Sequence, residues 1–142
     1  MIDKASLKGC KLMRNTYNIE AFQYVQNNLH LSLNETSEEK QFEPAGQVLA
    51  DSDDFSFIYL MEEDNQYSYI KFPQILWPQL VELLKTEENP YLQIGDQSIE
   101  LVHFNEELRT LILNIEGNDN YGTDFVNAVE NLFEPILKSE LL

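Results

Sequence analysis

The chain has 142 residues, a formal net charge of −16 and one cysteine, Cys10. This length is typical of one domain, and its 43% hydrophobic residues can supply a core. A body this acidic repels nucleic acid and anionic membranes, so neither is an expected partner. One cysteine excludes an internal disulfide and a multi-cysteine metal site, and a lone thiol indicates a cytoplasmic protein.

The charge is divided unevenly along the chain. Residues 1–14 carry four basic residues against one acid, whereas residues 15–142 carry five basic residues against 24 acids. The first segment also lacks a sustained hydrophobic period. We therefore expect a flexible basic extension at 1–14 and a single domain at 15–142. No apolar run approaches the ~20 residues that a membrane helix needs.

The first half of the domain predicts strands. Alternating apolar residues indicate strands at 19–25 and 29–33, joined as a hairpin by the polar residues between them. A short strand is expected at 46–50. Residues 55–61 and 66–72 place apolar side chains on both faces, which is typical of strands in the interior of a sheet.

The second half mixes helices with another hairpin. Apolar spacing predicts a helix at 77–84, with Pro78 in the first turn, where its missing N–H is no loss. A hairpin is expected over 91–102. The next helix begins near Asn105 and ends at Gly117, because glycine adopts the left-handed cap conformation readily.

A last helix is expected from Thr123, a good N-cap residue, and Pro135 weakens it near its end. Hairpin connections imply antiparallel pairing. The predicted fold is therefore α+β: an antiparallel sheet built from hairpins, with about three helices packed mainly on one face.

The densest acidic cluster begins at Asp51 and includes Asp53 and Asp54. Several close carboxylates could bind a cation. The run starts like a calcium-binding loop, but Phe55 occupies a ligand position and Ser56 occupies the position of the required glycine. The favoured interpretation is a turn in which side-chain oxygens accept backbone N–H bonds. No metal site or cofactor is predicted.

The connection from Gly117 to Gly122 contains Asn118, Asn120 and Tyr121. Glycine and asparagine occur in phosphate-binding loops, and a helix N-terminus follows. However, the loop has no lysine and its neighbouring carboxylates repel anions. We favour a tight link with two left-handed positions, beneath which the tyrosine packs.

A histidine beside two carboxylates and an aromatic sheet face are two further candidate features. His103 stands near Glu106 and Glu107, which could serve acid–base or metal chemistry, but a corner between strand and helix explains it as well. An aromatic sheet face is expected from Tyr67 and Tyr69, together with the aromatic residues at 55, 57 and 59. An exposed face would be a docking surface, and a covered one would be core.

Four segments together resemble a known family: GQVLADSD at 46–53, FIY at 57–59, Trp77, and NIEGNDNYG at 114–122. The chain resembles uncharacterised protein family 0738, small acidic proteins of Gram-positive bacteria. The likeness covers about residues 15–133. This family has no established activity, so the resemblance implies no site residues. Residues 1–12 precede the usual start, and Met13 falls where a first methionine is expected.

The favoured function is a small cytoplasmic, non-enzymatic binding or regulatory protein that contacts a basic protein partner. Its candidate binding residues are Tyr67, Tyr69, Asp51, Asp53, Asn118, Asn120 and Tyr121; no catalytic residue is assigned. Two alternatives stay open. Charge can serve solubility alone, or Asp51 and Asp53 can support a cation-assisted hydrolase. The oligomeric state is left undetermined.

Overall fold

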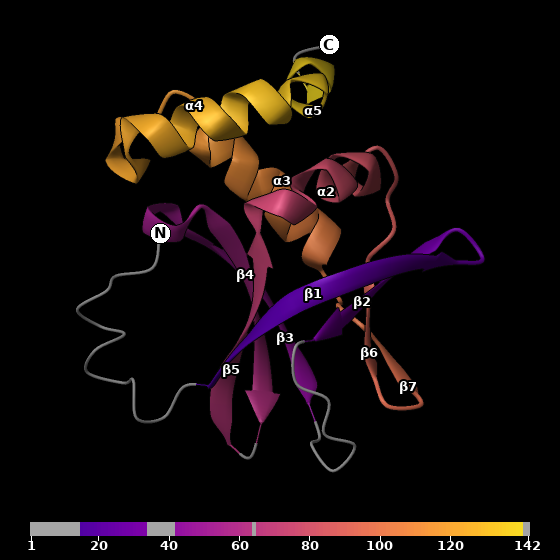
Figure 1. The fold of residues 1–142 in the computed structure, drawn as a ribbon. Coiled ribbons are helices and arrows are strands. Elements are labelled where there is room, and N and C mark those ends of the chain that lie inside the picture. Colours follow the sequence, from indigo (N-terminus) through magenta and orange to yellow (C-terminus); the bar gives the residue numbers. More distant parts are fainter. Residues whose placement is uncertain (1–14, 34–41, 64, 141–142) are drawn as a thin grey trace.

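The structure is a computed structural model and describes residues 15–33, 42–63 and 65–140 (Figure 1). The described strands are β1 (Asn15–Val25), β2 (Asn28–Leu33), β3 (Glu43–Asp51), β4 (Ser56–Glu63), β5 (Gln66–Pro73), β6 (Tyr91–Ile94) and β7 (Gln97–Glu100). The described α-helices are α2 (Trp77–Leu84), α3 (Phe104–Ile115), α4 (Thr123–Leu132) and α5 (Glu134–Glu140). Short 3-10 helices are η2 (Ser52–Asp54), η3 (Gln74–Leu76) and η4 (Asp119–Tyr121). The expected extension at 1–14, with its two candidate start methionines, lies outside the described residues.

The α+β prediction is confirmed, but the prediction of an antiparallel sheet is wrong. The strands form one mixed sheet in the order β3-β4-β5-β1-β2-β6-β7. Each hairpin is antiparallel, whereas β1 runs parallel to β5 and β2 runs parallel to β6. A tight turn forces its two strands to be antiparallel, but strands joined by longer connections can pair in either direction. The β1–β2 hairpin lies between two other groups of strands, and both of its outer joints are parallel.

The β1–β2 hairpin itself is as predicted. Gln26 and Asn27 form its turn, with φ of 53° and 70°. Two left-handed residues give a turn whose twist matches that of the flanking strands. A bulge between Ile19 and Ala21 shifts the register of β1. The tip of this hairpin projects at one side of the molecule (Figure 1).

One cluster of buried side chains runs from β1 to α5. The inner face of the sheet contributes Phe57, whose ring centroid lies 5.1 Å from that of Trp77 on α2. Phe57 also contacts Phe125 of α4 and Phe133, at 6.1 and 6.0 Å. Burying a large apolar side chain contributes about 1.5–3 kcal/mol. In Figure 1 the four helices lie together on one side of the sheet, so these aromatic contacts join the two layers.

The expected single aromatic face is wrong. In the register of β4 and β5, Tyr59 is opposite Ile70 and Leu60 is opposite Tyr69. Paired residues share a face, while successive residues alternate. Tyr69 therefore lies with Tyr67 on the face opposite to Tyr59. Tyr59 is fully buried against the helices, whereas Tyr67 is 41% exposed.

Two of the predicted helix signals are confirmed, and the N-cap predicted at Thr123 is wrong. Pro78 lies in the first turn of α2, and Gly117 follows α3 with φ of 69°, as expected. Thr123 is the first helical residue of α4, and Gly122 takes the N-cap position instead.

The expected last helix is two helices, which makes four α-helices in the described ranges. Phe133 interrupts the run with φ of −92° and ψ of 14°, and α5 starts at the next residue. Pro135 then lies at the start of a helix, where it is tolerated, and not in an interior. The break keeps the apolar side chains of Phe133, Ile136 and Leu137 buried.

Candidate functional site

The predicted acidic cluster is held by a lysine. Lys71 of β5 forms an ion pair with Asp54, and its Nζ lies 3.7 Å from a carboxylate oxygen of Asp51. No side-chain hydrogen bond from Asp51 caps η2. Asp53 is exposed. Within the described part of the chain, no group of three or more His, Cys, Asp or Glu side chains has the arrangement of a metal site.

The structure supports the predicted reading of the link between α3 and α4. Gly117 and Gly122 both have positive φ, and Tyr121 packs with its ring centroid 6.4 Å from that of Phe125. The Asn118 carboxamide oxygen accepts the backbone N–H of Asn120 at 3.1 Å. A carboxylate oxygen of Glu130 accepts the Gly117 N–H at 2.8 Å. Two backbone N–H groups of this link are therefore bonded by side chains of the chain itself.

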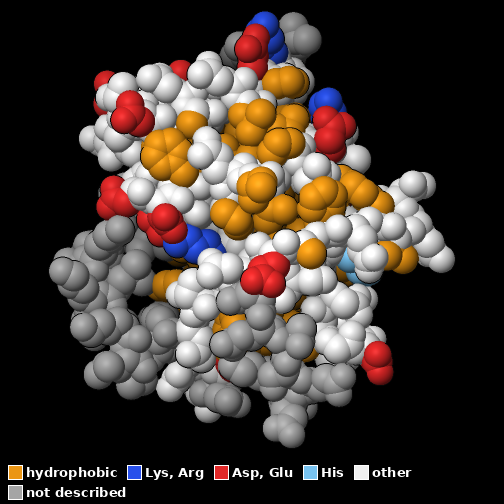
Figure 2. Space-filling view, in the orientation of Figure 1, with side chains coloured by type: hydrophobic (Ala, Val, Ile, Leu, Met, Phe, Trp, Pro, Cys, Tyr) orange, Lys and Arg blue, Asp and Glu red, His pale blue; other side chains and the backbone are white. Residues whose placement is uncertain are grey.

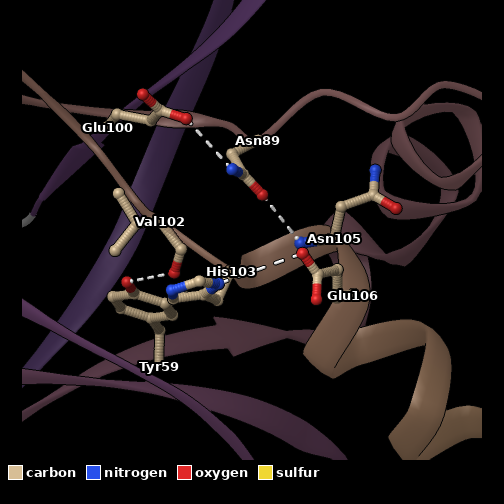
Figure 3. A network of polar contacts seen from close by, with 7 residues as sticks. All are labelled: Tyr59, Asn89, Glu100, Val102, His103, Asn105 and Glu106. Carbon is tan, nitrogen blue, oxygen red and sulfur yellow. Dashed lines mark hydrogen bonds and ion pairs between the residues drawn. The ribbon is translucent and has the colours of Figure 1, made fainter.

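His103 lies at the corner before α3, as predicted, with φ of 65° (Figure 3). Its Nδ1 is 3.9 Å from a carboxylate oxygen of Glu106. Nearby, the buried Tyr59 hydroxyl donates to the Val102 carbonyl oxygen at 2.7 Å. Burial is the main reason that the pKa of Tyr59 is raised. These contacts secure the corner above the sheet.

A cleft of about 850 Å³ lies between α2, α3 and α5. Asn105 and Arg109 of α3 are its central polar side chains. The Asn105 amide donates to the carbonyl oxygens of Leu83, Thr86 and Glu88 at 3.1, 3.1 and 2.8 Å. Arg109 donates to the carbonyl oxygen of Leu84. Both side chains thus stabilise the chain where α2 ends.

A different feature stands out on β1. This strand pairs with β5 only from Asn15, opposite Ser68, to Asn18, opposite Lys71. The chain then leaves the sheet at Pro73 and enters η3. Among the described strands, only β2 pairs with residues 21–25 of β1. We call residues 21–25 the β1 arm; its edge facing away from β2 has no described strand beside it.

The β1 arm is apolar and exposed. Phe22 is 42% exposed, Tyr24 52% and Val25 40%. The two aromatic rings contact each other edge to face, with centroids 6.1 Å apart. Ile75 of η3 is 84% exposed. Figure 2 shows apolar side chains gathered over η3 and α2, above the arm. Apolar residues grouped in this way are typical of docking surfaces.

Polar contacts fix the arm against α2. The Tyr24 hydroxyl donates to the carboxamide oxygen of Gln79 at 2.6 Å. The pKa of Tyr24 is raised, first by partial burial and second by the negative charge of Glu82. A small pocket of about 60 Å³ lies between Tyr24, Leu29 and Leu83. The arm therefore holds a defined position beside α2.

The described lysines form ion pairs within the chain. Lys85 pairs with Glu82 at 2.9 Å and Lys138 pairs with Glu134 at 2.6 Å. Lys71 pairs with the aspartates beside η2, as described above. Each described lysine therefore lies against a carboxylate of its own chain.

The structure does not bring the sequence-predicted site residues together. Tyr67 and Tyr69 lie on β5, the aspartates beside η2, and the asparagines in the α3–α4 link. Sequence reasoning missed the β1 arm as a surface. One signal was available: apolar residues occur at both odd and even positions in 21–25, so one face of the strand had to expose some of them.

Among the described helices, none has both the length and the apolar character needed to cross a bilayer. No solved structure matches the chain.

The model of a family of unknown function, UPF0738, matches residues 17–133. A UPF0738 protein of Lysinibacillus sphaericus is 48% identical over 125 residues, which is 88% of this chain and 98% of the relative. One of Bacillus cytotoxicus is 34% identical over 122 residues, 85% of this chain and 99% of the relative. In Staphylococcus epidermidis the identity is 45% over 92 residues, 65% of this chain and 76% of the relative. The chain belongs to the UPF0738 family.

Proposed function

We propose that this protein is a non-enzymatic, cytoplasmic binding module that docks a basic segment of another protein against the β1 arm. The observation that carries the proposal is the exposure of Phe22, Tyr24 and Val25 on a strand whose outer edge has no described neighbour. A few residues supply most of the binding energy of a protein interface, and tyrosine is among the types enriched there.

Charge supports a basic partner. The body beyond residue 14 has 24 acids against five bases, and Glu20 stands on β1 directly before the arm. Such a surface attracts basic segments and speeds their encounter, while it repels nucleic acid and anionic membranes. Neither of these is a proposed partner.

Calorimetric titration with two peptides tests the proposal. The basic probe is an acetylated and amidated peptide of alternating lysine and valine, seven residues long and beginning with lysine. The acidic probe replaces each lysine by glutamate. We expect the basic peptide to bind and its affinity to fall as salt shortens the Debye length to ~10 Å and below. No binding, or equal binding of both peptides, contradicts the proposal.

A matched pair of variants locates the surface. Phe22→Ser removes an aromatic ring that is 42% exposed, and Tyr67→Ser removes one that is 41% exposed on the other face of the sheet. Loss of an aromatic anchor costs about 2 kcal/mol, roughly a 30-fold weaker affinity. We expect that loss in the first variant and wild-type affinity in the second.

The hydrolase alternative at Asp51 and Asp53 has less support, because Lys71 already occupies the carboxylate of Asp51. Thermal unfolding with and without magnesium distinguishes the two. The binding-module proposal expects no change in the unfolding temperature. A stabilisation by magnesium that is lost in Asp51→Asn favours the hydrolase.

A further inference from the structure

We infer that the partner segment binds as an additional strand, in extended conformation, along the edge of the β1 arm that has no described strand beside it. This inference rests on the proposed function and specifies how the same surface works. β5 ends at Pro73, so it does not extend alongside residues 21–25 of β1. We call the position that a longer β5 would occupy beside these residues the slot.

The slot offers backbone groups to a partner. In a ladder, successive residues of a strand direct their N–H and C=O groups alternately toward one neighbour and the other. The β1 arm pairs with β2 on one side only among the described strands. The groups on its other side can therefore bond a further extended segment, a recognised mode of peptide binding.

Side chains around the slot specify an alternating partner. Phe22 is opposite Leu31 and Tyr24 is opposite Leu29, and both leucines are buried in the core. The two aromatic residues therefore point to the side of the sheet where the helices lie. A strand in the slot would direct every second side chain to that same side. Apolar residues fit there, beside exposed Ile75.

The remaining side chains of such a segment point to the other face, where the arm presents Ala21, Gln23 and Val25. Glu20 lies in the bulge that precedes the arm, and the protein as a whole carries −16. Lysine or arginine at these alternate positions is attracted by this field. A second copy of the chain has the same net charge, and its own arm would bring a second Glu20 to the contact. The occupant is therefore a basic, alternating segment of another protein.

Backbone N-methylation of the lysine–valine peptide provides the test. A methyl group on one nitrogen removes one donor and blocks approach on that side. Since donors alternate along a strand, methylating the central valine and methylating a neighbouring lysine modify opposite edges of the peptide. We expect one of these peptides to bind at least tenfold more weakly than the parent, and the other to bind within about threefold of the parent.

The outcomes separate the inference from the proposed function. If the parent peptide binds and both methylated peptides bind equally, strand addition is wrong while docking at the arm stands. If the parent peptide does not bind, both are wrong. Sedimentation of the protein alone completes the test: a dimer that Phe22→Ser dissociates places a second copy in the slot and overturns the inference.

Discussion

The side-chain amide of Asn105, near the start of α3, donates to the carbonyl oxygen of Leu83 in the last turn of α2 at 3.1 Å. The last carbonyl groups of a helix have no partners within it. The same amide also bonds two carbonyl groups of the following loop, and Asn105 is only 5% exposed. One buried side chain thus fastens the end of α2, the helix that lies beside the β1 arm.

Replacing Asn105 should therefore destabilise the fold. Asn105→Leu keeps a similar volume but leaves buried carbonyl groups without their donor, which costs about 2–4 kcal/mol. Urea unfolding measures this loss. The control is Asn114→Ala on the same helix, an exposed position, which should change the stability by less than about 0.5 kcal/mol. Equal stability of the two variants would contradict the assigned role.

Gly46 allows the corner at His103 to approach the sheet. Its φ is +77°, and a Cβ there would lie 3.1 Å from Cδ2 of the histidine. Gly46→Ala should cost about 1–2 kcal/mol, from backbone strain and from this contact. Gly117 has φ +69° and open space around it, so Gly117→Ala should cost only the backbone strain. In a His103→Ala background, the penalty at Gly46 should fall toward that of Gly117. An unchanged penalty would exclude the steric contribution.

The buried Tyr59 should make the free energy of unfolding fall at alkaline pH. Burial raises its pKa above the ordinary value of about 10, a hydrogen bond from the Gly46 backbone lowers it, and the charges of Glu100 and Glu107 raise it further. The folded protein then keeps a proton that the unfolded chain releases. Stability is therefore unaffected by this group below pH about 10 and falls as the pH rises above it.

The test for Tyr59 compares urea unfolding at neutral pH and just above pH 10. Tyr59→Phe should lose about 1 kcal/mol at neutral pH, because the bond to Val102 is gone. It should also show a shallower alkaline decline than the wild type. If Tyr59→Phe declines equally steeply, the assignment is wrong.

Lys71 should matter more than the other described lysines. It holds Asp51 and Asp54 at the turn between β3 and β4, and its side chain is largely covered. Lys71→Met should destabilise by about 1 kcal/mol, with a smaller effect in high salt. Lys138→Met, which removes an exposed pair with Glu134, should leave the unfolding midpoint unchanged. Equal effects of the two changes would argue against the bridge.

Local patterns predicted most of the secondary structure. The turn at Gln26 and Asn27, Pro78 in a first turn and Gly117 after a helix each depend on residues close in sequence. Local rules act over these distances. The parallel joints could not be predicted in this way, because β1 meets β5 across about 50 residues of chain.

Register explains the missed aromatic face and the missed surface. Alternation within β5 was predicted correctly, but its pairing with β4 decides which aromatic residues share a face. Likewise, Phe22 and Tyr24 are exposed because β5 ends before it reaches them, and a bulge after Ile19 turns them toward the helices. Both facts belong to pairing between strands, which a single strand's sequence does not contain.

Hydrogen exchange across residues 21–25 tests the binding account most directly. In the free protein, the amides of the β1 arm that point away from β2 should exchange rapidly, since no described strand bonds them. Addition of the lysine–valine peptide should slow these amides and leave the exposed stretch around Tyr67 unchanged. Protection that appears elsewhere on the sheet, or none at saturating peptide, would contradict the account.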